Sequence, residues 1–252
     1  MPAKGMKYMN WKYFIGKVLH MVETRVSRIN SDFVRKHYPY GRSWMFDVKR
    51  ALKNSPSLII DAGANIGSVS LELNCWFPDA KIYAFEPVMA TYECLCRQTA
   101  GKKSIHPLRL ALGCKNEHVE ILLNDENTIN SLKVTRIDGD MARKEVIPVV
   151  RLDDFLRKHS EPSIGILKID VEGFEFEVLN GCGTFLGAGI NCIYLEVGYE
   201  REATKVHFSD VEQYLERHGY LLCGVYETRR NLFDKRRLWY SNNLYIHKDL
   251  LM

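Results

Sequence analysis

Short apolar segments alternate with amphipathic segments along the chain from residue 57 onward. The apolar segments have the length and the β-branched content of buried strands, and they cover residues 58–61, 81–86, 105–110, 164–170 and 190–196. Helical spacing of apolar residues is found between and after them, over residues 69–76, 90–100, 152–159, 174–186 and 209–218. Strands and helices that alternate in this way are typical of a parallel sheet covered by helices. The pattern therefore predicts an α/β fold.

Two further pairs of strands are predicted outside that alternation. Residues 117–123 and 144–152 have the pattern of an antiparallel pair that encloses a polar segment, 124–140. Polar segments of this length are usually functional or mobile. Near the end of the chain, residues 220–226 and 243–247 predict a closing antiparallel pair joined by a polar connection.

Charge is distributed unevenly along the 252 residues. The whole chain carries 35 Lys and Arg against 31 Asp and Glu, whereas residues 1–54 carry 12 basic and 3 acidic side chains. We therefore expect a basic helical annex over residues 1–54 and one large domain over residues 55–252. The annex is either a contact for an anionic partner or a solvated helix face. Residues 4–19 interleave lysines with apolar side chains, which suits a peripheral membrane contact, docking on the core, or pairing with another subunit.

Composition and cysteine usage restrict the class of protein. Hydrophobic residues make up 46% and charged residues 26% of the chain, which argues against a disordered or collagen-like protein. The seven cysteines are odd in number and include no C-x-x-C pair, so we expect reduced thiols. Neither a signal peptide nor an apolar stretch of membrane-spanning length is indicated, and we expect a cytoplasmic protein.

A glycine turn follows the first predicted strand. Residues 58–67 read LIIDAGANIG, a buried strand that ends in Asp61 and continues through Gly63 toward a helix. Without a Cβ, Gly63 lets the backbone approach a ligand closely. The dinucleotide pattern G-x-G-x-x-G would need glycines where this chain has Asn65 and Ser68, which argues against a pyrophosphate ligand. Asp61 would repel a diphosphate but attract a sulfonium, so S-adenosylmethionine fits this turn better.

A second acid follows the next predicted strand. Residues 82–87 read IYAFEP, which places Glu86 at the carboxyl edge of the sheet beside the glycine turn. A carboxylate in that position can accept hydrogen bonds from both hydroxyls of a ribose. The separation between Asp61 and Glu86 matches one helix and one strand. The alternative for Glu86 is an ion-paired surface acid.

Two more acids follow a later strand, where a ligand would collect in a parallel sheet. Residues 164–173 read IGILKIDVEG, so that Asp170 and Glu172 emerge just before a helix. Alternation along the strand places Lys168 on the same side as both acids. One interpretation is a functional carboxylate pair. The other is a pair stabilised at a helix start, with Lys168 as its counter-charge.

Glu196 ends the strand that follows and is expected to face the same crevice. The loop after it, residues 197–208, contains His207, whose ordinary pKa lies near neutrality. His207 is therefore a candidate general base, and the alternative is a solvated loop histidine.

Four short segments resemble one known family when they are taken together. They read DAGANIG at 61–67, FEP at 85–87, LKIDVEGFE at 167–175 and SNNL at 241–244. This combination resembles the FkbM family of S-adenosylmethionine-dependent methyltransferases, over residues from about 40 to 246. The resemblance implies the class I methyltransferase fold, a Rossmann-like three-layer sandwich whose seven-stranded sheet is mostly parallel with an antiparallel last strand. It also implies methyl transfer to a hydroxyl oxygen, often of a sugar, a glycan or a natural product.

The resemblance indicates where the methyl donor would bind. Residues 61–67 would form the loop on the methionine side and Glu86 would hold the ribose, with S-adenosylhomocysteine as the product. The full set of expected donor-binding residues is Asp61, Gly63, Ala64, Asn65, Gly67, Ser68, Glu86, Pro87 and Asp170. We expect an in-line displacement, in which alignment contributes about 7 to 11 kcal/mol and a general base about 3 to 5 kcal/mol.

The sequence leaves the acceptor chemistry open. We expect a hydroxyl-bearing small molecule or glycan as acceptor, with Asp170 as the first candidate base, Glu172 as the second and Glu196 as the third. Alternatively, two of these acids would hold a divalent cation such as magnesium, for which we assign no ligands. The oligomeric state is left open.

Three other functions compete with this hypothesis. A nucleic-acid methyltransferase is favoured by the basic residues within 229–237, but residues 170–173 lack the prolines and the aromatic residue that base-methylating enzymes place there. A nicotinamide oxidoreductase is disfavoured by Asn65 and Ser68. The third is a binding module that keeps the fold without a donor.

Overall fold

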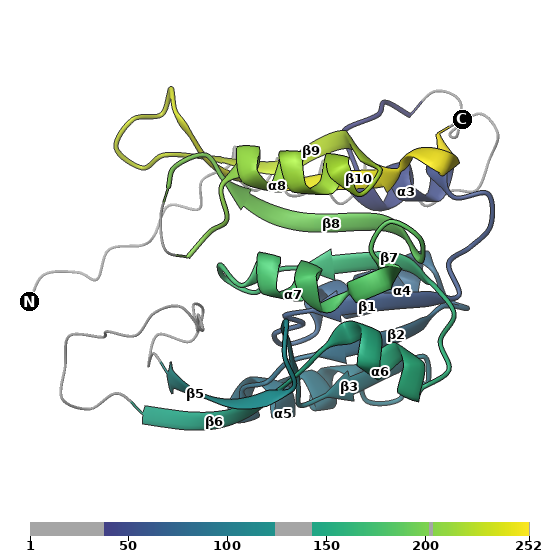
Figure 1. The fold of residues 1–252 in the computed structure, drawn as a ribbon, viewed down its shortest axis with the longest axis vertical. Coiled ribbons are helices and arrows are strands. Elements are labelled where there is room, and N and C mark those ends of the chain that lie inside the picture. Colours follow the sequence, from purple (N-terminus) through teal and green to yellow (C-terminus); the bar gives the residue numbers. More distant parts are fainter. Residues whose placement is uncertain (1–37, 124–142, 202–203, 252) are drawn as a thin grey trace, which may run out of the picture.

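A seven-stranded sheet lies at the centre of the structure (Figure 1), in the strand order β3-β2-β1-β7-β8-β10-β9. The computed structural model describes residues 38–123, 143–201 and 204–251. In chain order the strands of this sheet are β1 Leu58–Ala62, β2 Lys81–Phe85, β3 Ile105–Leu108, β7 Ile164–Ile169, β8 Ile190–Gly198, β9 Tyr220–Arg230 and β10 Leu238–His247. The pairs among β3, β2, β1, β7 and β8 are parallel, and β10 is antiparallel to both of its neighbours. The predicted α/β fold with an antiparallel last strand is therefore confirmed.

Helices cover both faces of the sheet (Figure 1). The helices are α3 Trp44–Ala51, α4 Ser68–Trp76, α5 Met89–Thr99, α6 Leu152–Lys158, α7 Glu175–Gly181 and α8 Phe208–Arg217, with short 3-10 turns at Gly183–Phe185 and Lys248–Leu250. Side chains of α6, α7 and α8 share one buried apolar cluster, and side chains of α3, α4 and α5 share another on the opposite face. This arrangement is the expected three-layer sandwich.

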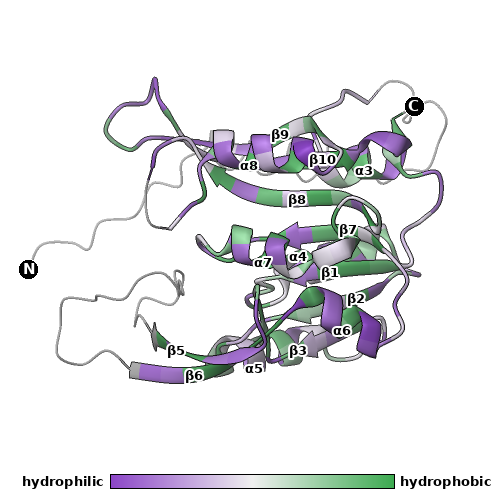
Figure 2. Cartoon of the chain, viewed as in Figure 1, coloured by the Kyte–Doolittle hydropathy of each residue, from purple (hydrophilic) through white to green (hydrophobic). Residues whose placement is uncertain are grey.

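The central strands are buried on both faces, as parallel strands between helix layers must be, and Figure 2 shows hydrophobic residues along them. Every residue of β1 and of β7 is buried. Two of these buried residues carry charge, Asp61 on β1 and Lys168 on β7, and they are register partners on adjacent strands. An isolated buried charge is costly, and here each charged side chain lies beside one of opposite sign. At this position the sheet has a buried charged pair in place of apolar side chains.

A smaller three-stranded sheet lies beside the carboxyl edge of the large one. It consists of β4 Ala111–Leu112, β6 Arg143–Val150 and β5 Glu117–Leu123, in that order. The antiparallel pairing of β5 with β6 confirms the predicted pair, although β6 ends at Val150 and not at residue 152, where α6 has already begun. The short strand β4, which is parallel to β6, lies just after the predicted strand 105–110 and was not predicted. The polar segment 124–140 lies outside the described residues.

The closing hairpin is longer than the sequence indicates. Strand β9 extends to Arg230 and β10 begins at Leu238, so much of the polar connection is paired backbone. Main-chain hydrogen bonds hold an antiparallel pair together without apolar side chains, which is why hydropathy missed these ends. Similarly, the predicted helix over 174–186 is α7, which ends at Gly181, followed by a 3-10 turn.

Helix α3 belongs to the same core as the sheet. Trp44 stacks on Tyr194 of β8 with ring centroids 4.0 Å apart and an interplanar angle of 10°. Asp47 accepts a 2.7 Å hydrogen bond from the hydroxyl of Tyr226 on β9. The predicted annex thus includes a helix that packs within the large domain, and the annex itself stays a prediction for residues 1–37, which lie outside the described part and include 4–19. Among the described helices, none has the length and hydrophobicity to cross a bilayer.

Candidate functional site

The turn after β1 is held between the ends of two neighbouring strands. The backbone N–H groups of Gly63 and Ala64 both donate to the carbonyl of Phe85, at 3.0 and 2.9 Å. Gly63 has a φ of 74°, and a Cβ there would lie 1.8 Å from the carbonyl oxygen of Asp170. Only glycine fits, because the turn after β7 passes directly over it. The sequence predicted close approach at Gly63, and the group that approaches is the protein's own backbone.

Glu86 follows β2 and is fixed by two backbone donors. Its Oε2 accepts from the N–H of Asn65 at 3.0 Å and its Oε1 accepts from the N–H of Val88 at 3.0 Å. The residue is 7% exposed, and burial raises the pKa of its carboxyl group to about 7 despite these hydrogen bonds. Glu86 is therefore a firmly oriented acid and not the surface acid of the alternative interpretation.

Asp61 lies beneath this turn. It is fully buried, its Oδ2 accepts from the Ser70 hydroxyl at 2.6 Å, and its Oδ1 lies 3.0 Å from the Lys168 ammonium. Lys168 also donates to the Gly63 carbonyl at 2.8 Å and lies 3.7 Å from Asp170. Burial opposes the charge on Lys168, but the carboxylates of Asp61 and Asp170 outweigh it and raise the pKa of the amine. The argument that the charge of Asp61 faces a sulfonium is therefore corrected: Lys168 matches that charge inside the protein.

A pocket opens at the carboxyl edge beside Glu86. It contains about 840 Å³ of empty space, including the part open to solvent. Its lining residues are Gly63, Asn65, Phe85, Glu86, Pro87, Val88, Thr91, Leu110, Ala111, Leu112, Ile121, Ile147, Asp170, Val171 and Glu172. The large sheet supplies its polar groups, and the region around the small sheet supplies an apolar wall. Such a wall with a few convergent polar groups is typical of a small-molecule site.

The pocket brings together part of the predicted set. Of the expected donor-binding residues it is lined by Gly63, Asn65, Glu86, Pro87 and Asp170, and the candidate base Glu172 lies there too. Asp61, Ala64, Gly67 and Ser68 do not line it. Gly67 instead packs against α5, since a Cβ on it would lie 2.7 Å from a methyl carbon of Leu95.

The apolar wall was missed by sequence reasoning. Leu110, Ala111 and Leu112 continue directly from β3, and Ile121 and Ile147 face the same space from β5 and β6. The apolar stretch at 110–112 is the signal that could have indicated this wall. It comes shortly after the end of a strand, as the glycine turn and Glu86 also do.

The turn after β7 is held by a buried acid. Glu172 has a φ of 51°, and Gly173 has a φ of 97°. The Oε1 of Glu175 accepts from the N–H groups of Gly173 and Val171, at 3.1 and 3.4 Å. Glu175 is 2% exposed, and burial raises the pKa of its carboxyl group to about 7. The hydrogen bonds to Glu175 thus stabilise the strained backbone at Glu172, and the side chain of Glu172 lies at the pocket.

A lysine links Glu172, which follows β7, to Glu196, which lies within β8. The ammonium of Lys205 forms an ion pair with Glu196 and lies 3.8 Å from the Oε2 of Glu172. It also lies 4.6 Å from the ring centroid of Tyr240. We call Glu172, Glu196, Lys205 and Tyr240 the Lys205 cluster. Burial raises the pKa of Glu172 to about 7, although Lys205 lowers it in part. Sequence reasoning missed Lys205 because nothing in its surroundings along the chain marks it.

His207 is placed at a helix start. Its Nδ1 accepts from the backbone N–H of Ser209 at 3.3 Å and lies 2.8 Å from the hydroxyl of that residue, so it caps α8. It does not line the pocket. A structural cap accounts for this histidine better than the general-base hypothesis.

Comparison with known proteins decides the family. Residues 61–222, well over half of the chain, match the Methyltransferase FkbM domain. The chain belongs to the FkbM methyltransferase family. It is 28% identical over 188 residues to Methyltransferase sdnD of Sordaria araneosa, covering 62% of this chain and 70% of that protein. It is 30% identical over 144 residues to Methyltransferase 1 of Beauveria bassiana (strain ARSEF 2860), covering 50% of this chain and 58% of that protein.

A solved structure supports the same fold. The crystal structure of an FkbM methyltransferase from Methylobacillus flagellatus KT superposes with a TM-score of 0.50 at 16% identity, covering 94% of this chain and 61% of that chain. The chain thus spans less than two thirds of that protein and of the Beauveria relative. The predictions of family, fold and an S-adenosylmethionine-dependent methyltransferase are confirmed. The oxidoreductase and binding-module alternatives are set aside.

The pocket suits the donor of this family. An adenine ring requires an apolar slot and a ribose requires an acceptor for two hydroxyls, and the pocket has the Leu112 and Ile147 wall at one side and the Glu86 carboxyl group at another. The polar rim at Asp170 and Glu172 lies beyond Glu86 along the carboxyl edge. These residues fit S-adenosylmethionine in chemistry.

The described residues offer no group of three or more His, Cys, Asp or Glu arranged to hold a metal ion. Between Glu172 and Glu196, where a divalent cation would need both carboxylates, the ammonium of Lys205 lies within ion-pair distance of each. An amine therefore supplies the positive charge that the metal hypothesis assigned to magnesium.

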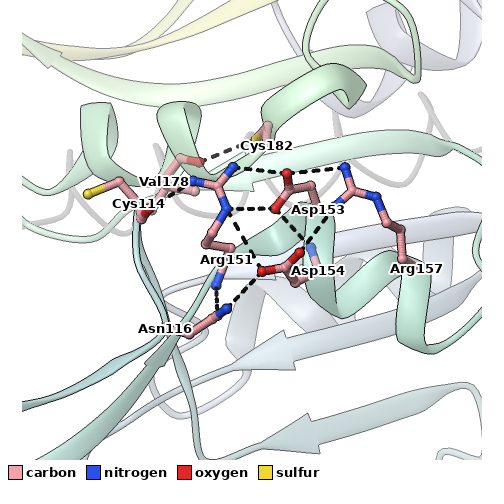
Figure 3. Close-up of polar contacts among 8 residues, drawn as sticks. All are labelled: Cys114, Asn116, Arg151, Asp153, Asp154, Arg157, Val178 and Cys182. Carbon is pink, nitrogen blue, oxygen red and sulfur yellow. Dashed lines mark hydrogen bonds and ion pairs between the residues drawn. The ribbon is translucent and has the colours of Figure 1, made fainter.

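A polar network fastens the connection after β4 to the start of α6 (Figure 3). Arg151 donates two 2.9 Å hydrogen bonds to the carboxylate of Asp153 and one of 2.8 Å to the carbonyl of Cys114. Its own N–H donates to the side-chain oxygen of Asn116 at 2.8 Å. Arg157 approaches the same Asp153 carboxylate at 3.4 Å. Since Cys114 and Asn116 follow β4, this network holds the apolar wall of the pocket in place.

Proposed function

We propose that this methyltransferase transfers its methyl group to a hydroxyl oxygen, of a sugar or glycan or of another hydroxyl-bearing natural product. The observation that supports this most directly is Glu172, a pocket-lining acid whose pKa is raised to about 7 by burial. A hydroxyl is a poor nucleophile until its proton is taken, and a base with a pKa near the working pH is best suited to take it. An amine acceptor would need such a base far less.

On this proposal the donor lies along the pocket. Glu86 accepts hydrogen bonds from the ribose, and Phe85, Leu112 and Ile147 pack against the adenine. Asp170, whose side chain is 45% exposed beside Lys168, receives the ammonium of the methionine part. S-adenosylmethionine supplies a methyl group on a cationic sulfur. The protein's part is to hold this group in line with the acceptor and to exclude water.

Glu172 acts as the general base in this proposal. It takes the hydroxyl proton while the oxygen–methyl bond forms and the carbon–sulfur bond breaks, the bonding electrons passing to sulfur. The sequence ranked Asp170 first, but Asp170 lies beside the Lys168 ammonium that also serves Asp61. Glu196 forms the closer of the two ion pairs of Lys205 and does not line the pocket, whereas Glu172 does. Glu172 therefore becomes the first candidate, with Lys205 as a positioning residue that orients its carboxyl group.

Alignment is expected to contribute more than the base. Holding acceptor oxygen, methyl carbon and sulfur in line contributes about 7 to 11 kcal/mol, against about 3 to 5 kcal/mol for proton removal. Consequently a variant that lacks the base keeps measurable activity, whereas one that loses the donor site does not.

The test follows an isotope-labelled methyl group into its acceptor. The full chain is incubated with methyl-labelled S-adenosylmethionine and separate fractions of glycans, small natural products and RNA, and the labelled product is fragmented by mass spectrometry. We expect label in a hydroxyl-bearing molecule, released as a methoxy fragment, and a slower but measurable rate of labelling in Glu172→Gln. Label on nitrogen, or in RNA alone, would overturn the proposal.

A further inference from the structure

The connection between β9 and β10 carries Phe233, the most exposed large hydrophobic side chain in the described part of the chain, next to Leu232. Phe233 is 99% exposed and Leu232 is 66% exposed, and the two are adjacent at the tip of a projecting hairpin (Figure 1). Single exposed apolar residues are common, but an aromatic and an aliphatic residue that are neighbours and both largely exposed forgo most of the free energy that their burial would provide. Such a pair is typical of a surface that is covered by a partner.

The hairpin tip, which we define as residues 231–237, is an ordered turn. The side-chain oxygen of Asn231 accepts from the N–H groups of Phe233 and Asp234, at 2.9 and 3.1 Å. The amide of Asn231 donates to Glu200 at 3.0 Å, and Arg237 pairs with the same carboxylate at 2.9 Å. The apolar pair is consequently held outward and cannot fold back onto the sheet without breaking these contacts.

Basic side chains surround the apolar pair. Residues 227–237 contain five cations against two acids, which is a net charge of +3. The cations are Arg229, Arg230, Lys235, Arg236 and Arg237, and the acids are Glu227 and Asp234. Arg236 is paired with Asp234, the one acid within residues 231–237, at 3.0 Å. The surface that complements this tip carries negative charge.

The hairpin adjoins the Lys205 cluster. The N–H of Tyr199, directly after β8, donates to the carbonyl of Trp239 at 2.9 Å, and Tyr240 on β10 packs on Lys205. Figure 1 shows the hairpin extending beyond the end of β8, the same edge of the sheet at which the pocket opens. Trp239 and Tyr240 thus form an aromatic base below the basic tip.

We propose that the hairpin tip docks on an anionic membrane surface, with Leu232 and Phe233 in the lipid interface and the surrounding arginines and lysine against lipid phosphates. An interfacial segment binds through just this combination of apolar side chains and cationic flanks. A convex tip with two apolar residues offers far less than the roughly 1,000 Å² that a stable protein interface buries. The tip therefore suits a deformable lipid surface better than a protein partner. In the docked orientation the Lys205 cluster faces the bilayer. The acceptor is then bound at the bilayer surface, a consequence that rests on the proposed function.

The experiment measures binding of the full chain to vesicles of phosphatidylcholine with and without phosphatidylglycerol, at low salt. We expect binding only to the anionic vesicles. The double variant L232S/F233S should bind about tenfold more weakly, and R229Q/K235Q about 20-fold more weakly. The matched control is L221S/V225S, which changes two residues of β9 that are 45% and 40% exposed away from the tip, and it should bind like the unaltered chain.

Each contrary result has a distinct meaning. If L232S/F233S binds anionic vesicles like the unaltered chain, docking at the tip is wrong and residues before 38 account for the binding. Salt-sensitive binding to single-stranded RNA without vesicle binding would overturn the proposal in favour of nucleic acid, and a concentration-dependent dimer lost in L232S/F233S would overturn it in favour of a second copy. Affinity for S-adenosylhomocysteine, measured on every variant, reports the donor site separately.

Discussion

The two ends of the site are built in different ways. The proposed donor end, around Glu86, consists of residues that directly follow strand ends, and backbone N–H groups of Asn65 and Val88 hold its carboxyl group. The proposed acceptor end is the Lys205 cluster, in which charged side chains from three separate segments hold one another. A site whose geometry is held by backbone hydrogen bonds tolerates most side-chain substitutions. A site held by ion pairs depends on each charged side chain.

This difference predicts that donor affinity and turnover respond to different substitutions. Donor affinity should respond to Glu86 and to the wall of the small sheet, and turnover should respond to Glu172 and Lys205. The turn that carries Asp170 and Glu172 belongs to both ends, because Gly63 packs against it on one side and Glu175 supports it from below. The following changes test this separation, beginning with the largest expected effect.

Glu172→Gln should lower kcat by about 100-fold to 10,000-fold, the usual contribution of a general base, while the Kd for S-adenosylhomocysteine changes by less than about threefold. Turnover is measured with the acceptor found by isotope labelling. Glu200→Gln is the matched control, since Glu200 is paired with Arg237 outside the pocket. Retained turnover in Glu172→Gln, with the loss appearing in Asp170→Asn instead, would return Asp170 to first place.

The pH profile gives a second measure of the same group. Burial raises the pKa of Glu172 from 4.5 to about 7, so below that pH the carboxyl group is protonated and cannot accept a proton. We expect kcat/KM to fall about tenfold per pH unit below this pKa. The inflection should vanish in Glu172→Gln, and an unchanged inflection there would assign it to another group.

Glu86→Ala should weaken S-adenosylhomocysteine binding about 100-fold, because two hydrogen bonds from the ribose to a buried, pre-oriented carboxyl group are lost. Isothermal titration measures the Kd. Glu93→Ala is the control, since its side chain is 60% exposed on α5. A Kd within about threefold of that of the unaltered protein would mean that Glu86 holds only the backbone of the turn.

Glu175→Gln tests the support under the shared turn. The folded-state pKa of Glu175, about 7, lies above its ordinary 4.5 because of burial. Its contribution to stability is therefore fully present below about pH 4.5 and is lost as the pH rises through 7. In the variant, the fall in the free energy of unfolding between about pH 5 and 8 should shrink by on the order of 3 kcal/mol. Chemical denaturation at several pH values measures it, and an unchanged slope would contradict the assignment.

Arg151→Met should give the smallest effect, through the wall of the small sheet. The Asp153 side chain is only 6% exposed and loses its bidentate partner, which should cost roughly 1 to 2 kcal/mol and lower the Tm by about 4 °C. Donor affinity should fall about threefold as the wall loosens. Arg157→Met, whose side chain is 54% exposed against the same Asp153, is the control and should change little. Equal effects of the two variants would argue against a specific role for Arg151.

Most elements of the fold could be predicted, β4 excepted, because each has a local hydropathy pattern. Burial on both faces makes β1 and β7 continuous apolar runs, and the positions of Asp61, Glu86, Asp170 and Glu196 at or near the carboxyl ends of strands follow from that pattern. The length of the β9–β10 hairpin was underestimated, because backbone pairing leaves no trace in hydropathy.

The sequence by itself determined the family, the sheet and which acids gather at its carboxyl edge, because strand ends and glycine turns are set by residues a few positions apart. The charged partners of these acids were set only by the tertiary structure. It paired Asp61 with Lys168 from a distant strand, placed Lys205 between Glu172 and Glu196, and closed the pocket with the small sheet. The charge and the pKa of a carboxyl group depend on neighbours in space, and those neighbours come from parts of the chain that no local pattern connects.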